Sequence, residues 1–563
     1  MTEYTGADLF VDALSEYGVS RVFGNPGTTE LPVLKAIGDS DLEYVLGLHE
    51  DIAVGMAGGY AQTRRYHAHH DGVMPASVVN LHVTPGLAHG LGNVYAAKMT
   101  GAPMVVTAGN HELHFRHEEP ILSGDLLELA EQFCKFSTEV TDVDALPSVL
   151  RRAFREALTP PTGPVFLALP ADVMMDATEE SVEPLGPIPT AGRGDPAQID
   201  RAADLLAAAD EPVFVLGDHV ARAGGADSAV ELAEATGARV HGEMLACEVS
   251  FPGDHEQWLS FIPPREEFAA TLMDTDTLLF AGCSTNTTLL PHESDLVSGD
   301  ATCVHVSDDP SEVGRLYPTD AAVVGDPDAV LADLADRVRE RVDDGERERR
   351  LAAVRDRKEA VAGVIEGIGT GDAEDDPRAS KADLVDSIRA AAPDAYVVDE
   401  GVTSKYPLMM RWPLQPEQFV SNKGGGLGYG LPASVGAAFA EHERGADGGP
   451  TRDVIGYVGD GSYLYYPHSL YTAARHDLDL TVVVSDNRNY RILKDNTTAM
   501  FGGTDEDHTY VGMDFDPPVD IPTNAESHGA TGRLVEDPEA IEEAVADAIA
   551  SGGPHVLDVL VHD

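Results

Sequence analysis

The chain is poor in cysteine and has no long apolar run. Its 563 residues include only 4 cysteines, Cys134, Cys247, Cys283 and Cys303, which form no CxxC pair. This spacing excludes a zinc motif and a disulfide framework, and we interpret the cysteines as small buried residues in a reducing compartment. No apolar run reaches the roughly 18 residues of a membrane helix, and the first residues lack the basic and apolar regions of a signal peptide. We therefore expect a soluble, cytoplasmic protein.

Positive charge is also scarce. The chain has 38 basic residues, of which 8 are lysine, against 96 acidic residues, so its formal net charge is −58. This charge repels the phosphates of nucleic acids and anionic membrane surfaces, so we expect neither as a partner. The acidic residues are spread along the whole chain. An acidic, lysine-poor surface is typical of halophilic proteins, whose self-repulsion is screened by salt.

Short β-branched runs, such as 104–108, 213–216 and 480–485, alternate with alanine-rich amphipathic stretches. This pattern predicts an α/β protein with doubly wound parallel sheets. The rhythm is broken by the Pro/Gly-rich segment 183–197 and by the charged segment 337–378, whose second half has the composition of a linker. Cutting there predicts three domains, at residues 1–180, 195–340 and 378–563. The alternative is that both segments are long surface loops inside larger domains.

Polar residues follow two predicted strands of the third domain. The strand 454–458 runs into Gly459-Asp460-Gly461-Ser462, and the strand 480–485 is followed by Asp486-Asn487-Arg488-Asn489. The carboxyl ends of parallel strands meet at the edge of the sheet where ligands bind. The Asp460 carboxylate, the Asn487 amide oxygen and the Asn489 backbone carbonyl form an all-oxygen set that suits Mg²⁺ shared with phosphate. The two glycines allow the backbone to approach a diphosphate, and the N–H groups of the following helix would face it.

The GDGS motif followed by Asn487 resembles the diphosphate-binding motif of the thiamine diphosphate enzymes. The resemblance extends over essentially the whole chain and implies a pyrimidine-binding domain, a central domain and a diphosphate-binding domain, in that order. Within the family, the chain most resembles the benzoylformate decarboxylases. The segments that carry this resemblance are Phe23–Pro32, Gly59–Gln62, Asn80–His82 and Gly425–Pro432.

The resemblance assigns cofactor-binding roles. It makes Glu50 the glutamate that hydrogen-bonds the aminopyrimidine ring of thiamine diphosphate and promotes loss of the thiazolium proton. The alternative for Glu50 is an acid that only complements a helix dipole. It makes Leu427 the apolar side chain that holds the two cofactor rings in a bent shape. The expected cofactor-binding set is Glu50, Thr403, Ser404, Gly426, Leu427, Gly459, Asp460, Gly461, Ser462, Asn487, Asn489 and Tyr490, with Asp460, Asn487 and Asn489 as metal ligands.

Two further residues are candidates for contact with the substrate. In the decarboxylases that the chain resembles, a histidine at the place of His82 exchanges protons with reaction intermediates. Thr28 lies where they have a serine that contacts the substrate carboxylate. Their second active-site histidine has no counterpart at the same place, because His292 lies about three residues further along the chain. This difference leaves the identity of the 2-oxo acid open. We interpret the His-rich tract 66–71 as a surface loop after a helix rather than as a metal site.

The implied activity is thiamine diphosphate- and Mg²⁺-dependent decarboxylation of a small 2-oxo acid to an aldehyde and CO₂. One alternative is a carboligase of the acetolactate synthase type, which joins two 2-oxo acids, and another is an inactive scaffold of the same fold. Two features argue against the synthase and against FAD. The synthases usually have no histidine at the place of His82, and flavin-binding synthases carry an Arg-Phe-Asp-Asp-Arg run where this chain has Gly-Cys-Ser-Thr-Asn after the strand 278–281. The resemblance also implies a homodimer or homotetramer with active sites between subunits, because Glu50 and Asp460 would contact one cofactor from opposite subunits.

Overall fold

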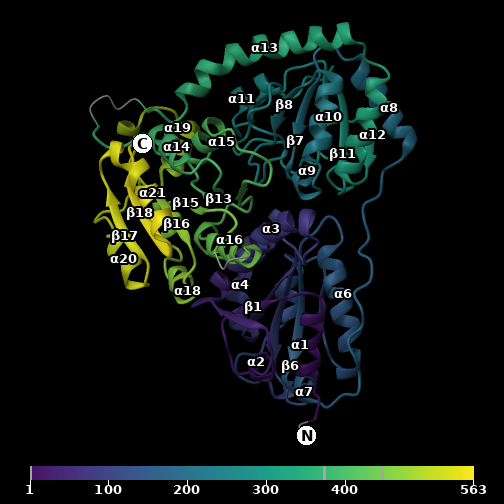
Figure 1. Ribbon diagram of the computed structural model, residues 1–563, viewed down its shortest axis with the longest axis vertical. Helices are drawn as coiled ribbons and strands as arrows, with labels where there is room; N and C mark the ends of the chain where they lie inside the picture. The colour runs from purple at the N-terminus through teal and green to yellow at the C-terminus, as the bar shows by residue number, and fades with distance from the viewer. Residues whose placement is uncertain (1–2, 372–375, 446–448) are drawn as a thin grey trace.

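The computed structural model describes residues 3–371, 376–445 and 449–563. Within these residues the chain forms three six-stranded sheets, with strand orders β2-β1-β3-β4-β6-β5, β12-β11-β10-β7-β8-β9 and β14-β13-β15-β16-β18-β17 (Figure 1). Neighbouring strands in each sheet are parallel. The strand order has a switch point between β1 and β3, between β7 and β10, and between β13 and β15, as in doubly wound folds. In the N- and C-terminal sheets the last two strands also exchange places. The predicted fold class, three doubly wound parallel sheets of an α/β protein, is confirmed.

The N-terminal sheet is formed by β1 (Arg21–Gly24), β2 (Glu43–Leu46), β3 (Ser77–Leu81), β4 (Met104–Asn110), β5 (Ser137–Glu139) and β6 (Pro164–Pro170). Its helices are α1 (Gly6–Glu16), α2 (Leu31–Gly38), α3 (Glu50–Asp71), α4 (Val83–Thr100), η1 (Arg116–Glu118), α5 (Leu126–Glu131), η2 (Val143–Ala145), α6 (Leu146–Leu158) and α7 (Ala171–Met175). All residues of β3, β4 and β6 are buried. These strands read as continuous apolar runs because helices cover both faces of a parallel sheet.

The central sheet is formed by β7 (Val213–Leu216), β8 (Arg239–Gly242), β9 (Trp258–Phe261), β10 (Thr277–Ala281), β11 (Thr302–Ser307) and β12 (Ala321–Val324). Its helices are α8 (Pro196–Ala208), α9 (Asp218–Arg222), α10 (Ala226–Thr236), α11 (Glu266–Leu272) and α12 (Pro327–Arg339). The long helix α13 (Asp344–Gly367) follows and runs across the top of Figure 1 toward the C-terminal sheet. Part of the predicted linker after it, residues 372–375, lies outside the described residues.

The C-terminal sheet is formed by β13 (Tyr396–Glu400), β14 (Phe419–Ser421), β15 (Val454–Gly459), β16 (Leu480–Asp486), β17 (Thr531–Val535) and β18 (Pro554–Leu560). Its helices are α14 (Lys381–Ala391), α15 (Lys405–Arg411), α16 (Gly430–Arg444), α17 (Asp460–Tyr463), α18 (Ser469–Arg475), α19 (Arg491–Phe501), η3 (Asp505–Asp507), α20 (Ile521–Ser527), η4 (Pro538–Ala540) and α21 (Ile541–Ser551). No helix in the described part of the chain is long and apolar enough to cross a membrane.

Helices α3 and α16 join the N-terminal and C-terminal sheets. They approach so closely that a Cβ atom on Gly59 would overlap the carbonyl of Ala433, and one on Gly436 would overlap that of Met56. Only glycine allows two helix backbones to approach this far. Buried apolar side chains of both helices belong to one core that spans the two sheets. This contact fixes the direction of α3, and Glu50 is the first residue of that helix.

The structure corrects the interpretation of the histidine tract. Residues 66–71 are the last turns of α3, not a loop. His67 is buried and its Nε2 lies 3.0 Å from Glu441, while His69 and His70 both contact Glu417. The hydrogen-bond partners of these histidines come from the C-terminal part of the chain, so the local composition does not indicate that this polar segment is helical.

Candidate active site

The expected metal ligands lie together at the carboxyl ends of β15 and β16. Asp460, Asn487 and Asn489 are all buried, with 4%, 8% and 7% of their surface exposed. The Asp460 Oδ2 and Asn489 Oδ1 atoms have no hydrogen-bond partner among the described residues. Buried oxygens without partners are costly unless a ligand satisfies them. This oxygen set fits a hard divalent cation such as Mg²⁺.

The charge around Asp460 supports the same ligand. Burial, and next the neighbouring Asp486, raise the pKa of the Asp460 carboxyl to about 8. Burial and Asp486 also raise the pKa of Asp558 to about 7. Three carboxyl groups are therefore crowded together in a buried region, and a cation would stabilise their ionised forms.

The Asn487 amide has a fixed orientation. Its Nδ2 donates to the Asp563 carboxylate over 2.9 Å, so its Oδ1 faces away from Asp563. The Asn489 amide also donates, to the backbone carbonyl of Asn487 over 2.7 Å, and this leaves the Asn489 side-chain oxygen free. The sequence predicts the backbone carbonyl of Asn489 as the ligand atom, and its side-chain oxygen is a second candidate because it has no partner among the described residues.

The helix after Gly459 is short. It is the four-residue turn α17, and the Gly461 N–H donates to the Asp460 carboxylate over 2.8 Å. A Cβ atom on Gly461 would press against the ring of Tyr490, so glycine is required there. The Ser462 hydroxyl donates to the Glu400 carbonyl over 3.2 Å. The turn is thus held between β13 and the segment after β16.

Glu400 at the end of β13 holds the glycine-rich loop that carries Leu427. Its buried carboxylate accepts hydrogen bonds from the N–H groups of Gly428, Tyr429 and Gly430, at 3.2, 3.1 and 2.9 Å. These groups lie at the start of α16, so the carboxylate also complements the helix dipole. Sequence reasoning missed this anchor, because nothing in the local pattern places Glu400 beside a loop some thirty residues later.

Of the two expected hydroxyls after β13, Thr403 is the better placed. Ser404 is buried, and both its N–H and its hydroxyl donate to the Gly401 carbonyl, at 3.0 and 2.9 Å. Neither donor of Ser404 is left for a diphosphate. Thr403 is half-buried, and its hydroxyl has no hydrogen bond among the described contacts.

Glu50 begins α3 beside two imidazoles. Its Oε2 lies 3.1 Å from Nδ1 of His89, and the rings of His89 and His49 stack with 5.2 Å between centroids. His49 caps α3 by accepting the Asp51 N–H over 3.1 Å. Asp51, not Glu50, binds α4 and the Tyr466 hydroxyl. Because His49 and Asp51 already make the structural contacts of this helix end, Glu50 is available for a ligand.

His82 has a partner that sequence reasoning missed. Its Nδ1 lies 2.9 Å from Oε2 of Glu30, whose other oxygen accepts from Thr29 and from the N–H of Val83. Glu30 is 1% exposed, and Val83 has a positive φ of 29°. Glu30 lies in the segment Phe23–Pro32 that carried the family resemblance, but its contact with His82 is visible only in the fold.

Glu50 and His82 both lie beside Gly86 of α4. A Cβ atom on Gly86 would lie 3.3 Å from Oε1 of Glu50 and 3.0 Å from Cβ of His82. Thr28 is exposed on the loop before Glu30. The structure thus brings three predicted residues of the N-terminal part into one region, with Glu30 and His89 as additions.

His292 does not share these contacts. It is exposed on the loop after β10, and its Nδ1 bonds the carbonyl of Ser294 over 2.8 Å.

Comparison with known proteins identifies the family. Models of the thiamine pyrophosphate enzymes match at residues 4–130 (N-terminal TPP binding domain), 199–334 (central domain) and 401–559 (C-terminal TPP binding domain). The chain is also 30% identical to a benzoylformate decarboxylase from Pseudomonas aeruginosa, over 97% of each chain. The chain belongs to the thiamine pyrophosphate enzyme family.

Other members of the thiamine pyrophosphate enzymes are similar over nearly the full length. The large subunit of acetolactate synthase isozyme 3 from Escherichia coli is 26% identical, covering 98% of this chain and 93% of its own. A solved 4-hydroxybenzoylformate decarboxylase from Rhodococcus jostii is 28% identical with a TM-score of 0.83, over 99% of both chains. A solved benzoylformate decarboxylase from Polynucleobacter necessarius is 25% identical with a TM-score of 0.85, over 99% of this chain and 98% of its own. The TPP-binding domains imply thiamine diphosphate as the cofactor.

Proposed function

We propose that the protein catalyses the thiamine diphosphate- and Mg²⁺-dependent, non-oxidative decarboxylation of a 2-oxo acid to an aldehyde and CO₂. The observation that carries this proposal is the His82–Glu30 pair, because His82 and Glu50 both lie beside Gly86. Thiamine diphosphate, when bound, supplies the carbon nucleophile and the electron sink for cleaving the bond to the carboxylate. The chain's own residues must then bind the cofactor and move protons.

Asp460, Asn487 and Asn489 would hold the Mg²⁺ ion that bridges the protein and the diphosphate. The unpartnered oxygens of Asp460 and Asn489 support this role. Thr403 would donate its hydroxyl to the diphosphate. Leu427 would support the cofactor rings from the loop that Glu400 anchors.

Glu50 would exchange a proton with the aminopyrimidine ring. Its carboxyl group is only 14% exposed and has the ionisable His89 at 3.1 Å. A carboxyl group that is partly withdrawn from water and lies beside an imidazole is suited to proton transfer. His89 can hold Glu50 in position until the cofactor replaces or joins that contact.

His82 would exchange a proton with the substrate. The Glu30 carboxylate accepts from Nδ1, so this nitrogen carries the hydrogen in the neutral ring and Nε2 is left to accept or donate. Val83 N–H and the Thr29 hydroxyl hold the carboxylate in turn. Glu30 therefore selects the tautomer and the orientation of His82. Thr28, exposed on the same loop, is the candidate for contact with the substrate carboxylate.

The test is a product analysis with the purified enzyme, thiamine diphosphate and Mg²⁺. Pyruvate, branched 2-oxo acids and benzoylformate are supplied one at a time, and CO₂, aldehyde and 2-hydroxy-2-alkyl-3-oxo acid products are measured. Release of CO₂ with a matching amount of aldehyde supports the proposal. Formation of a joined product without free aldehyde would instead establish the carboligase, and a yellow protein with a flavin spectrum would revive the FAD-binding synthase.

We also propose that the active enzyme is a homodimer or a dimer of dimers, with each site built from two subunits. Within one chain the contacts of Glu50 described by the structure come from His89, and none come from the loop of Leu427 or from Asp460. A second copy of the chain would bring a diphosphate site to Glu50.

A further inference from the structure

The central sheet has a switch point in its strand order, where doubly wound folds bind anions in a crevice. Its order β12-β11-β10-β7-β8-β9 reverses between β10 and β7, and ligands of such sheets bind beyond the carboxyl ends of the strands at this point. In this chain a carboxylate of the protein itself occupies the crevice. Oε1 of Glu243 accepts from the N–H of Asp218 over 2.9 Å, and Oε2 accepts from those of Ser284 and Thr285 at 2.9 and 2.7 Å.

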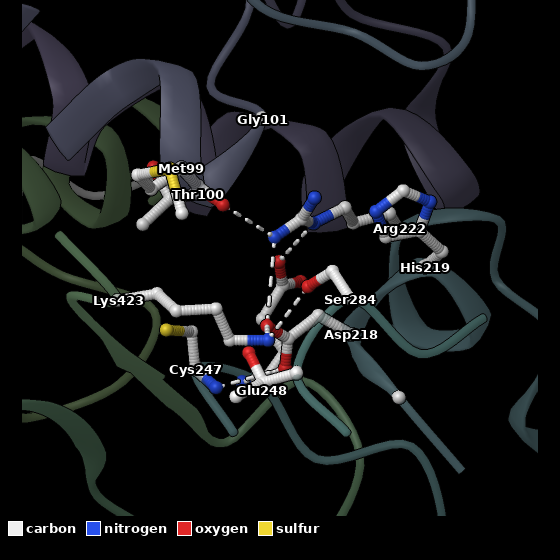
Figure 2. Close-up of polar contacts among 12 residues, drawn as sticks. Met99, Thr100, Gly101, Asp218, His219, Arg222, Cys247, Glu248, Ser284 and Lys423 are labelled. Atoms are coloured by element: carbon white, nitrogen blue, oxygen red, sulfur yellow. Dashed lines mark hydrogen bonds and ion pairs between the residues drawn. The ribbon is translucent and has the colours of Figure 1, made fainter. Parts of the chain in front are cut away.

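A lysine from the C-terminal part of the chain enters the same crevice. Nζ of Lys423 lies 2.7 Å from both Glu243 Oε1 and Asp218 Oδ2, and 2.9 Å from the Ser284 hydroxyl. Figure 2 shows the lysine reaching Asp218 and Ser284 from the opposite ribbon. The lysine side chain is 2% exposed and both carboxylates are 0% exposed. Two strand-end carboxylates thus bind one ammonium group instead of an external ligand.

Lys423 stands immediately before the loop that carries Leu427. The middle of this loop makes few contacts, because a Cβ atom on Gly425 or Gly426 would meet no atom within 4 Å. Its far end is fixed by the Glu400 carboxylate at Gly428 and the next two residues. The near end is fixed by Lys423. Asn422 also holds the loop, since its Nδ2 donates to the Gly426 carbonyl over 3.2 Å and its Oδ1 accepts from the Gly424 N–H over 2.6 Å. Among these anchors of the loop that carries Leu427, Lys423 is the one whose partners lie in the central domain.

We propose that Lys423 is a positioning residue of the thiamine diphosphate site and that Asp218, Glu243 and Ser284 of the central domain form its socket. The proposal rests on the proposed function, because the loop is assigned to the cofactor there. The central domain contributes none of the expected ligands of the cofactor. Through Lys423 it would nevertheless take part in cofactor binding. The backbone N–H groups of Asp218, Ser284 and Thr285, which could otherwise bind a nucleotide diphosphate, already donate to Glu243.

The electrostatics of the socket support a fixed contact. Although burial alone would lower it, the charges of Asp218 and Glu243 raise the pKa of Lys423 above its ordinary value. Burial alone would raise the pKa of Asp218, but Lys423 and Arg222 hold it below its ordinary range. The Lys423 ammonium and the Asp218 carboxylate are therefore charged together at neutral pH, and breaking the contact would leave a buried charge unpaired.

The main test is the double variant Lys423→Met with Glu243→Gln. It removes one charge of each sign, and Asp218 keeps Arg222 as an ion partner. The glutamine oxygen can still accept from Ser284 and Thr285, while the Asp218 N–H loses its acceptor. Thiamine diphosphate affinity in Mg²⁺ is measured by isothermal titration. Hydrogen exchange of residues 424–429 is measured in the cofactor-free protein. We expect at least roughly tenfold weaker binding and faster exchange in this segment, as for the loss of a charged contact.

The matched control is Arg222→Met. Arg222 lies in the same buried cluster, contacting Glu248 over 3.0 Å and the Met99 carbonyl over 3.4 Å (Figure 2). Its removal weakens the contact between the N-terminal and central parts but leaves Glu248 with Arg65 and Asp218 with Lys423. The control should bind thiamine diphosphate with wild-type affinity. Equal losses in the control and the double variant would show that the effect is general to domain contacts, and would overturn the proposal.

If the double variant does not fold, the proposal is tested with a milder variant. Ser284→Ala removes one neutral hydroxyl from the ammonium and leaves no charge unpaired. It should weaken thiamine diphosphate binding by roughly threefold to tenfold. Wild-type binding and wild-type loop exchange in a folded variant would overturn the proposal. If the wild-type protein itself binds no thiamine diphosphate, the proposed function fails instead, so the two failures are distinguishable.

Discussion

Three glutamates of the described site differ in role because different groups lie beside them. Glu30 contacts an imidazole, Glu50 begins a helix next to His89, and Glu400 accepts three backbone N–H groups. The first can orient a ring, the second can exchange a proton with a ligand, and the third can hold a loop. These roles lead to separate expectations for single substitutions.

Glu50→Gln should retain thiamine diphosphate but lose activity by at least roughly a hundredfold, because the amide cannot exchange a proton with the pyrimidine ring. The direct measurement is exchange of the C2 proton of the bound cofactor, followed by NMR. Binding by isothermal titration is the control. If the C2 proton exchanges at the wild-type rate in this variant, Glu50 only complements the helix dipole and takes no part in proton transfer.

Glu30→Leu should lower kcat by roughly tenfold to a hundredfold with a smaller effect on KM, because His82 loses the acceptor that selects its tautomer. Glu30→Gln keeps a carbonyl oxygen for the Nδ1 hydrogen and should retain more activity. The ¹⁵N chemical shifts of the His82 ring report the tautomer directly. If they are identical in the wild type and Glu30→Leu, the carboxylate does not orient the ring.

Asp460→Ala should abolish Mg²⁺-dependent binding of thiamine diphosphate, because the diphosphate loses its main electrostatic bridge to the protein. Isothermal titration with and without Mg²⁺ measures this effect. Thr403→Val is the companion variant and should weaken binding while leaving its Mg²⁺ dependence intact. Wild-type affinity of Asp460→Ala would remove this residue from the ligand set.

At the level of elements, the glycine-rich loop and the start of α16 depend on the ionisation of Glu400. Burial raises the pKa of Glu400 to about 7 from an ordinary value of 4.5, and the three N–H bonds offset this only in part. The folded protein therefore binds more protons than the unfolded chain between these values. The free energy of unfolding should fall as the pH rises from about 4.5 to 7, by at most roughly 3 kcal/mol from this group.

Glu400→Gln should remove that part of the pH dependence. Denaturant unfolding of the two proteins is compared at several pH values at constant high salt. The difference between wild type and variant isolates this group from the other buried acids. Parallel curves for the two proteins would show that Glu400 is ionised in both states across this range.

The elements themselves were largely predictable, and the contacts between them were not. The apolar runs at 213–216 and 480–485 became β7 and β16, because a strand buried on both faces leaves a continuous apolar signal. The GDGS motif predicted where the proposed oxygen ligands lie, at the carboxyl end of a strand. The contacts of Glu30 with His82 and of Lys423 with Glu243 join distant segments, and only the folded chain shows them. The histidine tract was misread because its helical partners also come from far along the chain.

At the scale of the whole molecule, the proposed shared site predicts complementation between inactive subunits. Glu50→Gln and Asp460→Ala chains, each inactive alone, should regain part of the activity when mixed, because one site of each hybrid dimer is built from two unmutated halves. The chains must be unfolded and refolded together at high salt, which screens the net charge of −58.

Activity and light scattering together give the answer. Refolded mixtures of each variant with itself are the controls and should remain inactive. Hybrids that form and bind cofactor yet stay inactive would contradict the shared site. A monomer by light scattering that still turns over substrate would contradict it as well.

The glycine contact between α3 and α16 limits how this chain can change in length. Glu50 stands nine residues before Gly59, and the helix between them is continuous. Each residue inserted in that stretch would advance Glu50 by about 1.5 Å and rotate it by about 100° around the helix axis. A single insertion would therefore turn the carboxylate away from Gly86, whereas many substitutions would leave it in place. The stretch from Glu50 to Gly59 works as a fixed-length spacer, and length variation in this enzyme must occur elsewhere in the chain.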